Sequence, residues 1–253
     1  MSMPTIFVSH GAPTLILSDA PARTFLTGLS QQIPRPTAIV AVSAHWDTDV
    51  PVVSVARKPD TIHDFYGFPE ALYQLRYAAP GAPALAEKVA KLTGAAHDHR
   101  GLDHGAWVPA MLAWPEADIP IFQLSVQPAL SPAHHIALGR KLASLREEGI
   151  LVMGSGSAIH NLRALVRSEG ASEPEPWAQA FDDWMADTLE KGDEPALADY
   201  RARAPYAREA HPTEEHLLPL HVAYGAAGEG ARGRALHRSF TLGNLSMAAY
   251  AFG

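Results

Sequence analysis

Short apolar runs of strand length alternate along the chain with segments whose apolar residues recur at helical spacing. The apolar runs predict strands at residues 5–9, 38–43, 52–55, 120–126 and 150–153. The helical spacing predicts helices at residues 20–31, 82–93, 132–148, 177–190, 194–203 and 212–225. Gly94 and Gly149 directly follow two of these helical patterns, in the position where glycine often ends a helix.

Strands separated by helices indicate an α/β fold, with a mostly parallel central sheet flanked by helices. Two strand-like segments, 236–241 and 245–251, flank Gly243 and Asn244, which predicts a C-terminal antiparallel hairpin. The Glu- and Pro-rich stretch 169–176 is expected to be a surface loop rather than a linker. We therefore expect one domain spanning residues 1–253.

The composition narrows the functional classes. Hydrophobic residues make up 47% and charged residues 19% of the chain, which is typical of a folded globular protein. A net charge of -7 without a run of Lys or Arg argues against nucleic-acid binding. No segment approaches the ~18 apolar residues of a membrane span, and the N-terminus does not resemble a signal peptide. A cytoplasmic protein is expected.

Cysteine is absent, which excludes disulfides, Cys-type zinc sites, iron–sulfur clusters and cysteine nucleophiles. The chain has 13 histidines, so histidine is the expected ligand if a metal ion is bound.

Three predicted strands are followed by histidines: His10, His45 and His160. In open α/β sheets, ligands bind beyond the carboxyl ends of the strands, where these side chains could converge. A single buried histidine is more often a hydrogen-bonded core residue than a ligand. Three in equivalent positions favour a shared site.

The segment HPTEEHLLPLH, residues 211–221, offers a fourth candidate, His216. Pro212 is expected in the first turn of a helix and His216 one turn further on. In the alternative interpretation, three histidines of this segment are merely polar surface residues: His211, His216 and His221. Their spacing of five residues excludes a helix of the HExxH zinc type.

Loops supply further candidates. His104 lies in GLDHGAWVP, where Gly101 and Gly105 indicate a loop. This histidine either contacts a substrate or merely stacks within a Trp- and Pro-rich loop. TIHDFYGFP, residues 61–69, is an aromatic loop that forms either the wall of a flat pocket or a minor core flap. The glycine-rich residues 154–157 match no phosphate-binding or nucleophile motif, and we expect a tight turn there that presents His160.

Seven motifs in order resemble the 4,5-DOPA extradiol dioxygenase group of the class III extradiol ring-cleavage dioxygenases, which is related to the catalytic subunit of protocatechuate 4,5-dioxygenase. They are SHGAP, VSAHWDT, TIHDFYGFP, GLDHGAWVP, GSGSAIHNL, HPTEEHLLPL and LSMAAYAFG. These motifs run through essentially the whole chain. The resemblance implies cleavage of a catechol-type ring by O₂ at one non-haem metal ion.

The resemblance also implies residue roles. His10, His45 and His216 would be metal ligands, while Glu214 and Glu215 stay alternatives to His216, because the wider superfamily uses two histidines and a carboxylate. His160 would be an acid/base beside the metal, or a fourth ligand, and His104 would face the substrate as a second catalytic histidine. The expected substrate-binding residues are Tyr66, Trp107 and His211.

We expect Fe(II) for activity, although three histidines suit Zn(II) equally well. The expected partners are a small aromatic diol and O₂, and both a monomer and a homodimer are plausible. A zinc hydrolase, a non-catalytic metal- or ligand-binding protein, and a domain with purely structural histidines remain alternatives. A hydrolase would act without oxygen.

Overall fold

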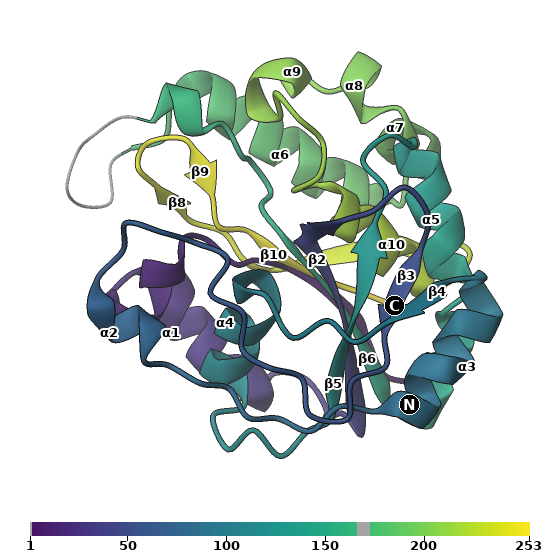
Figure 1. Cartoon of the computed structure of the whole chain (residues 1–253). Helices are drawn as coiled ribbons and strands as arrows, with labels where there is room; N and C mark the ends of the chain where they lie inside the picture. Colours follow the sequence, from purple (N-terminus) through teal and green to yellow (C-terminus); the bar gives the residue numbers. More distant parts are fainter. Residues whose placement is uncertain (1, 166–172) are drawn as a thin grey trace.

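A twisted eight-stranded sheet forms the centre of the fold in the computed structural model, which describes residues 2–165 and 173–253 (Figure 1). Its strands are β1 (Thr5–Ser9), β2 (Ala38–Asp47), β3 (Val52–Ser54), β4 (Ala96–Asp98), β5 (Ile121–Val126), β6 (Ile150–Gly156), β7 (Gly233–His237) and β10 (Ala249–Phe252). Their order across the sheet is β4-β3-β5-β2-β6-β1-β10-β7.

The middle of the sheet is parallel and its C-terminal side is antiparallel. β5, β2, β6 and β1 are parallel neighbours, as are β3 and β4. β10 pairs antiparallel with both β1 and β7, and β3 pairs antiparallel with β5. This arrangement confirms the α/β class, the mostly parallel sheet and its antiparallel end. The parallel strands bring the carboxyl ends of β1, β2 and β6 to one edge.

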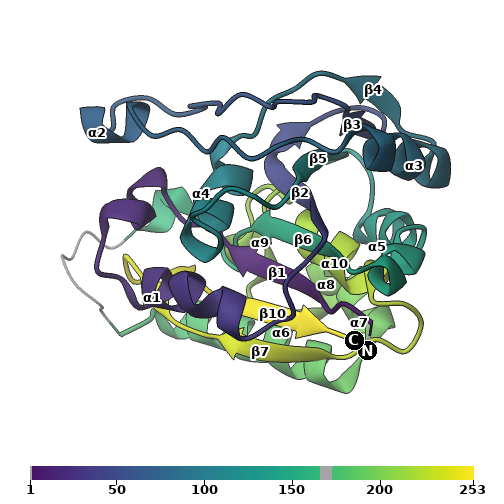
Figure 2. The same cartoon turned by 90° about the horizontal axis from the view of Figure 1, so that it is seen from below.

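Successive side chains of the strands point to opposite faces of the sheet and pack into an apolar layer on each face. Ile6 and Val8 belong to the layer of α1 (Pro21–Gly28) and α4 (His104–Ala113), whereas Phe7 belongs to the opposite layer. That opposite layer contains α3 (Pro83–Thr93), α5 (Pro132–Arg140), α6 (Pro176–Lys191) and α10 (Leu218–Ala226). Figure 2 shows α1 and α4 on one side of the sheet, and α5, α6 and α10 on the other.

The C-terminal hairpin forms where it was predicted, around Gly243, but it is short. β8 (Phe240–Thr241) pairs antiparallel with β9 (Leu245–Ser246) apart from the main sheet. The outer parts of the two predicted segments instead contribute to β7 and β10 in the main sheet. Part of the predicted surface loop, residues 169–172, lies outside the described residues, and α6 begins at Pro176.

Several predicted helices are shorter than their hydrophobic pattern indicated. The pattern at 132–148 divides into α5 and a 3-10 helix, η3 (Ala143–Glu148), which ends at Gly149 in the left-handed region with φ 73°. The pattern at 20–31 divides into α1 and η2 (Leu29–Gln31), and that at 194–203 into α7 (Glu194–Ala198) and α8 (Tyr200–Arg203). Apolar spacing marks the buried face but does not separate α from 3-10 turns.

The helix predicted at 212–225 begins only at Leu218, so the expected place of Pro212 in its first turn is wrong. Residues 212–217 are turns and bends instead. The physical reason is Pro219, which lacks a backbone N–H and therefore fits the first turn of a helix but not its interior.

The largest element that the sequence analysis missed is α4, because residues 101–105 were interpreted as a loop. Asp103 is its N-cap and accepts a hydrogen bond from the Ala106 N–H, so His104 is the first helical residue. Nearly every residue of α4 is buried, so the helix lacks the polar face by which a helical period is recognised. Other missed elements are short: β4, α2 (Glu70–Tyr73), α9 (Ala207–Ala210), η1 (Pro13–Leu17) and η4 (Leu162–Ala164).

Candidate metal centre

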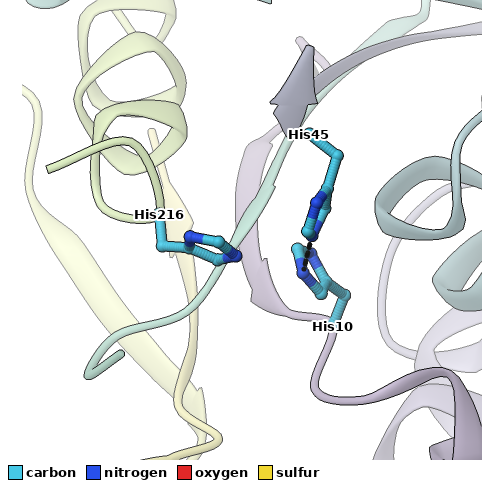
Figure 3. A group of neighbouring side chains, drawn as sticks. All are labelled: His10, His45 and His216. Atoms are coloured by element: carbon cyan, nitrogen blue, oxygen red, sulfur yellow. Dashed lines mark hydrogen bonds between the residues drawn. The ribbon is translucent and has the colours of Figure 1, made fainter. Parts of the chain in front are cut away.

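Three histidines from distant parts of the chain converge at the carboxyl edge of the sheet (Figure 3). His10 directly follows β1, His45 lies near the end of β2, and His216 lies just before α10. The Nε2 atoms of His10 and His45 are 3.0 Å apart. Each ring offers a nitrogen, and these three nitrogens lie within 4.8 Å of one another. Their geometry suits three ligands of one metal ion.

Burial keeps these imidazoles neutral. It lowers the pKa of His10 well below its ordinary value, with a further contribution from His45. Burial and the neighbouring His104 lower the pKa of His45 to about 3. Burial also lowers the pKa of His216 to about 4, although its hydrogen bond with Glu215 opposes the shift. Neutral imidazole is the form that binds metals, so protons do not compete for these nitrogens at neutral pH.

Oxygen atoms accept hydrogen bonds from the outer nitrogens of His10 and His216. The His216 Nδ1–H donates to the Glu215 carboxylate at 2.9 Å. The hydroxyl of Ser155 donates to the Gly105 carbonyl, so its oxygen accepts from the Nδ1–H of His10 at 3.0 Å. The Nδ1 of His45 lies 3.7 Å from Asp64, beyond hydrogen-bond distance. The two hydrogen bonds place the proton of His10 and His216 on Nδ1 and leave Nε2 of these two rings free as the ligand atom.

Glu215 is ionised in this arrangement, whereas Glu214 turns away. Burial raises the pKa of Glu215, but the hydrogen bond and charge of His216 outweigh burial and lower it to about 2. One oxygen of its carboxylate and one nitrogen each of His160 and His216 lie within 4.8 Å of one another. Glu214 accepts a hydrogen bond from the Arg201 Nε–H at 2.6 Å. Of the two alternative carboxylate ligands, only Glu215 is therefore near the histidines.

Two glycines of β6 set the position of His216. A Cβ at Gly156 would lie 2.0 Å from the His216 carbonyl oxygen, and a Cβ at Gly154 would lie 2.2 Å from the Pro219 carbonyl oxygen. The Ser157 N–H then donates to the His216 carbonyl at 2.9 Å. The predicted tight turn at 154–157 is thus wrong, because β6 continues to Gly156 and its glycines admit the neighbouring backbone.

His160 and His104 lie beside the three convergent rings. The His160 ring stacks on His216 with centroids 3.5 Å apart and planes 12° apart. Burial lowers the pKa of His160 to about 4, although the charge of Glu215 opposes the shift. The His104 ring centre lies 4.0 Å from that of His45 and 5.2 Å from that of His10. The structure therefore gathers all five predicted metal-binding and catalytic histidines.

The three predicted substrate-binding residues occupy other positions. Trp107 is fully buried, and its Nε1–H donates to the Ile62 carbonyl at 3.0 Å. Tyr66 is 93% exposed, so it packs into no pocket. His211 is fully buried and donates from Nε2 to the Ala158 carbonyl at 2.9 Å. These placements do not support direct contact with a substrate.

Phe65 is the aromatic residue of loop 61–69 that contacts the site, with its ring centre 5.8 Å from that of His104. The sequence analysis did not single out Phe65 from the other aromatic residues of this loop, and it missed Asp64 and Ser155. The adjacent pairs His63–Asp64 and Glu215–His216 were the available signals, since a carboxylate beside a histidine often orients a ligand.

The alternative of surface-polar histidines in the segment 211–221 is wrong. His211 and His221 are fully buried and His216 is 6% exposed, because α9 and α10 pack this segment against β6 and α6.

No helix in residues 2–165 and 173–253 has both the length and the apolar character needed to cross a membrane.

Comparisons with known proteins show the family of this chain. Residues 4–253 match the family described as the catalytic LigB subunit of aromatic ring-opening dioxygenase. The chain is 45% identical to the 4,5-DOPA dioxygenase extradiol of Beta vulgaris, over 98% of this chain and 96% of that protein. It is 41% identical to the protein of that name from Escherichia coli K12, over 88% of this chain and 85% of the relative.

A solved structure matches as well. The crystal structure of the uncharacterized protein JW3007 from Escherichia coli K12 superposes with a TM-score of 0.82 at 33% identity, over 99% of this chain and all of that one. The chain thus belongs to the LigB family of aromatic ring-opening dioxygenases, which are extradiol dioxygenases of class III.

Proposed function

We propose that this extradiol dioxygenase inserts both atoms of O₂ into a small catechol, with DOPA-like compounds as the first substrates to test. The observation that carries the proposal is the convergence of His10, His45 and His216 at the sheet edge, in a chain that matches a ring-opening dioxygenase family from residue 4 to residue 253. The names of the relatives from Beta vulgaris and Escherichia coli support the substrate class.

The family implies a metal cofactor, and the donor set fits one. We propose that His10, His45 and His216 hold Fe(II) through Nε2, with Zn(II) as an alternative occupant of the same three nitrogens. Fe(II) would supply the redox chemistry that direct reaction of O₂ with a catechol lacks, and would hold both reactants together.

The remaining histidines carry the proton chemistry in this proposal. His104 accepts a proton from a substrate hydroxyl, because its ring lies beside His45 and within reach of the same space. His160 acts as the second acid/base, because its ring stacks on His216 and burial keeps it neutral. Phe65 replaces Tyr66 and Trp107 as the residue proposed to contact the substrate ring, since it is the one that meets His104.

Oxygen uptake tests the proposal. Protein loaded anaerobically with Fe(II) is offered a panel of catechols that includes DOPA, and oxygen consumption and product absorbance are followed together. We expect one O₂ per catechol and a yellow ring-opened product. The variants His10→Ala and His45→Ala should lose uptake, whereas His99→Ala, which alters an exposed histidine, should retain it.

Hydrolysis and metal-binding assays on the same protein, beside the oxygen-uptake assay, separate the alternative functions. Hydrolysis of an ester or amide by the zinc-loaded protein without oxygen, with no uptake on any catechol, would favour a zinc hydrolase. Metal binding without either activity would favour a binding protein. We further propose a cytoplasmic protein, which fits the cysteine-free composition, and either a monomer or a homodimer.

A further inference from the structure

The loop that precedes α4 is joined along its length to the segment 60–64. The Leu102 N–H donates to the Asp60 carbonyl and the Ile62 N–H donates to the Leu102 carbonyl, each at 2.7 Å. Gly101 permits this approach, because a Cβ there would lie 2.3 Å from the Asp60 carbonyl oxygen. These hydrogen bonds between the two segments place Asp64 beside the first turn of α4.

Both carboxylate oxygens of Asp64 accept hydrogen bonds from one residue, His104. Oδ1 accepts from the His104 backbone N–H and Oδ2 accepts from the ring Nδ1–H, both at 2.9 Å. A carboxylate at neutral pH can only accept hydrogen bonds, so the ring proton sits on Nδ1. The other ring nitrogen, Nε2, is left with a free lone pair.

We propose that Asp64 is a positioning residue, which fixes the tautomer and orientation of His104 so that Nε2 is the base for a substrate hydroxyl. This inference rests on the proposed function. The proton moves from the hydroxyl oxygen to Nε2, the O–H electron pair stays on oxygen, and His104 becomes an imidazolium. The Asp64 carboxylate then stabilises that positive charge at hydrogen-bond distance.

A second cation shared by His45, Asp64 and His104 is the competing explanation, since one ligand atom from each lies within 4.8 Å of the others. The contacts favour positioning. The Asp64 oxygens already accept two hydrogen bonds from His104, and His45 Nδ1 is farther away at 3.7 Å.

Asp64→Asn is the informative variant, because the amide keeps the shape of the carboxylate. The His104 backbone N–H can only donate, so it takes the amide oxygen. The amide NH₂ then faces Nδ1 and shifts the ring proton to Nε2. Asp60→Asn is the matched control, since it alters an exposed carboxyl in the same segment.

The first readout needs no activity. Nitrogen-15 NMR of the metal-free protein should show that His104 has a protonated Nδ1 and an unprotonated Nε2. The two ring signals of His104 are assigned because they disappear from the spectrum of His104→Gln. Asp64→Asn should exchange the two signals, whereas Asp60→Asn should not. An unchanged tautomer in Asp64→Asn would overturn the proposal, as would a second bound metal equivalent that this variant loses.

Kinetics supply the second readout. In the Fe(II)-loaded enzyme, Asp64→Asn should lower kcat by about 10²–10⁴-fold with KM and metal content near those of the wild type. A kcat within about 2-fold of wild type would overturn the role of Asp64 in proton transfer. If the wild type consumes no oxygen with any catechol, the proposed function fails, and the NMR result still decides what Asp64 does to His104.

Discussion

At the residue scale, the orientation of each imidazole depends on the atom that faces its outer nitrogen. Ser155 accepts from His10, Glu215 accepts from His216, and Asp64 accepts from His104. Each of these oxygens holds a proton on Nδ1. Without such partners a ring would sample both tautomers and several rotamers, which for His10 and His216 would lower metal affinity.

Glu215→Ala should weaken metal binding by about 10–100-fold, because His216 loses the acceptor that fixes its tautomer. Competition with a chromophoric chelator measures the change. Glu214→Ala is the matched control, since that carboxylate pairs with Arg201 instead, and its affinity should stay near that of the wild type.

A comparison of His216→Ala with Glu215→Ala decides which side chain is the third ligand. If Glu215 rather than His216 binds the metal, His216→Ala should retain most of the affinity and Glu215→Ala should lose nearly all of it. We expect the reverse order.

At the element scale, the site depends on how closely the first turn of α10 and the segment before it approach β6. Gly154 and Gly156 remove the two side chains that would separate them, so backbone carbonyls of Pro219 and His216 pack directly against the strand. Gly105 does the same for α4, because a Cβ there would lie 2.4 Å from Ser43 Oγ and 3.2 Å from the His10 ring. Contacts this close explain why three elements can aim side chains at one point.

Gly156→Ala should destabilise the protein by about 1–3 kcal/mol or more and should also lower metal affinity, because the new methyl group displaces His216. Gly28→Ala provides the control. Gly28 ends α1 with φ -87° and has no atom within 4 Å of its added Cβ, so alanine should be neutral or stabilise by up to about 1 kcal/mol. Urea unfolding and chelator competition measure the two effects, and unchanged affinity in a folded Gly156→Ala protein would contradict the positioning role.

At the scale of the whole molecule, the fold buries an unusual number of neutral imidazoles. Burial is the largest cause of a lowered pKa at nine histidines: His10, His45, His134, His135, His160, His211, His216, His221 and His237. An unfolded chain exposes the same rings to water, where their pKa returns to about 6.5. The folded state therefore binds fewer protons than the unfolded state below that pH.

The metal-free protein should consequently lose stability as the pH falls from about 6.5 towards about 4. The unfolded state binds the additional protons in this range, so the free energy of unfolding rises with pH. Each buried histidine contributes up to about 1.4 kcal/mol per pH unit between its folded and unfolded pKa. Urea unfolding at pH 7.5, 6.0 and 5.0 measures the slope.

Histidine substitutions outside the metal centre provide the control for that slope. His135→Gln should reduce it, because His135 is buried with a pKa lowered to about 4. His99→Gln, at an exposed position, should leave it unchanged. A free energy of unfolding that is constant between pH 7.5 and 5.0 would show that these rings are protonated in the folded protein too.

The sequence by itself determined the α/β class, most strands of the parallel part of the sheet, and the histidines that follow them, because apolar periodicity and strand-end position are local properties. The tertiary structure decided what surrounds those histidines. Asp64 reaches His104 across 40 residues and Ser155 reaches His10 across 145, and no local pattern encodes such contacts. It also placed Phe65, not Tyr66 or Trp107, beside the site, since the side chain that a loop turns inward depends on packing against the rest of the fold.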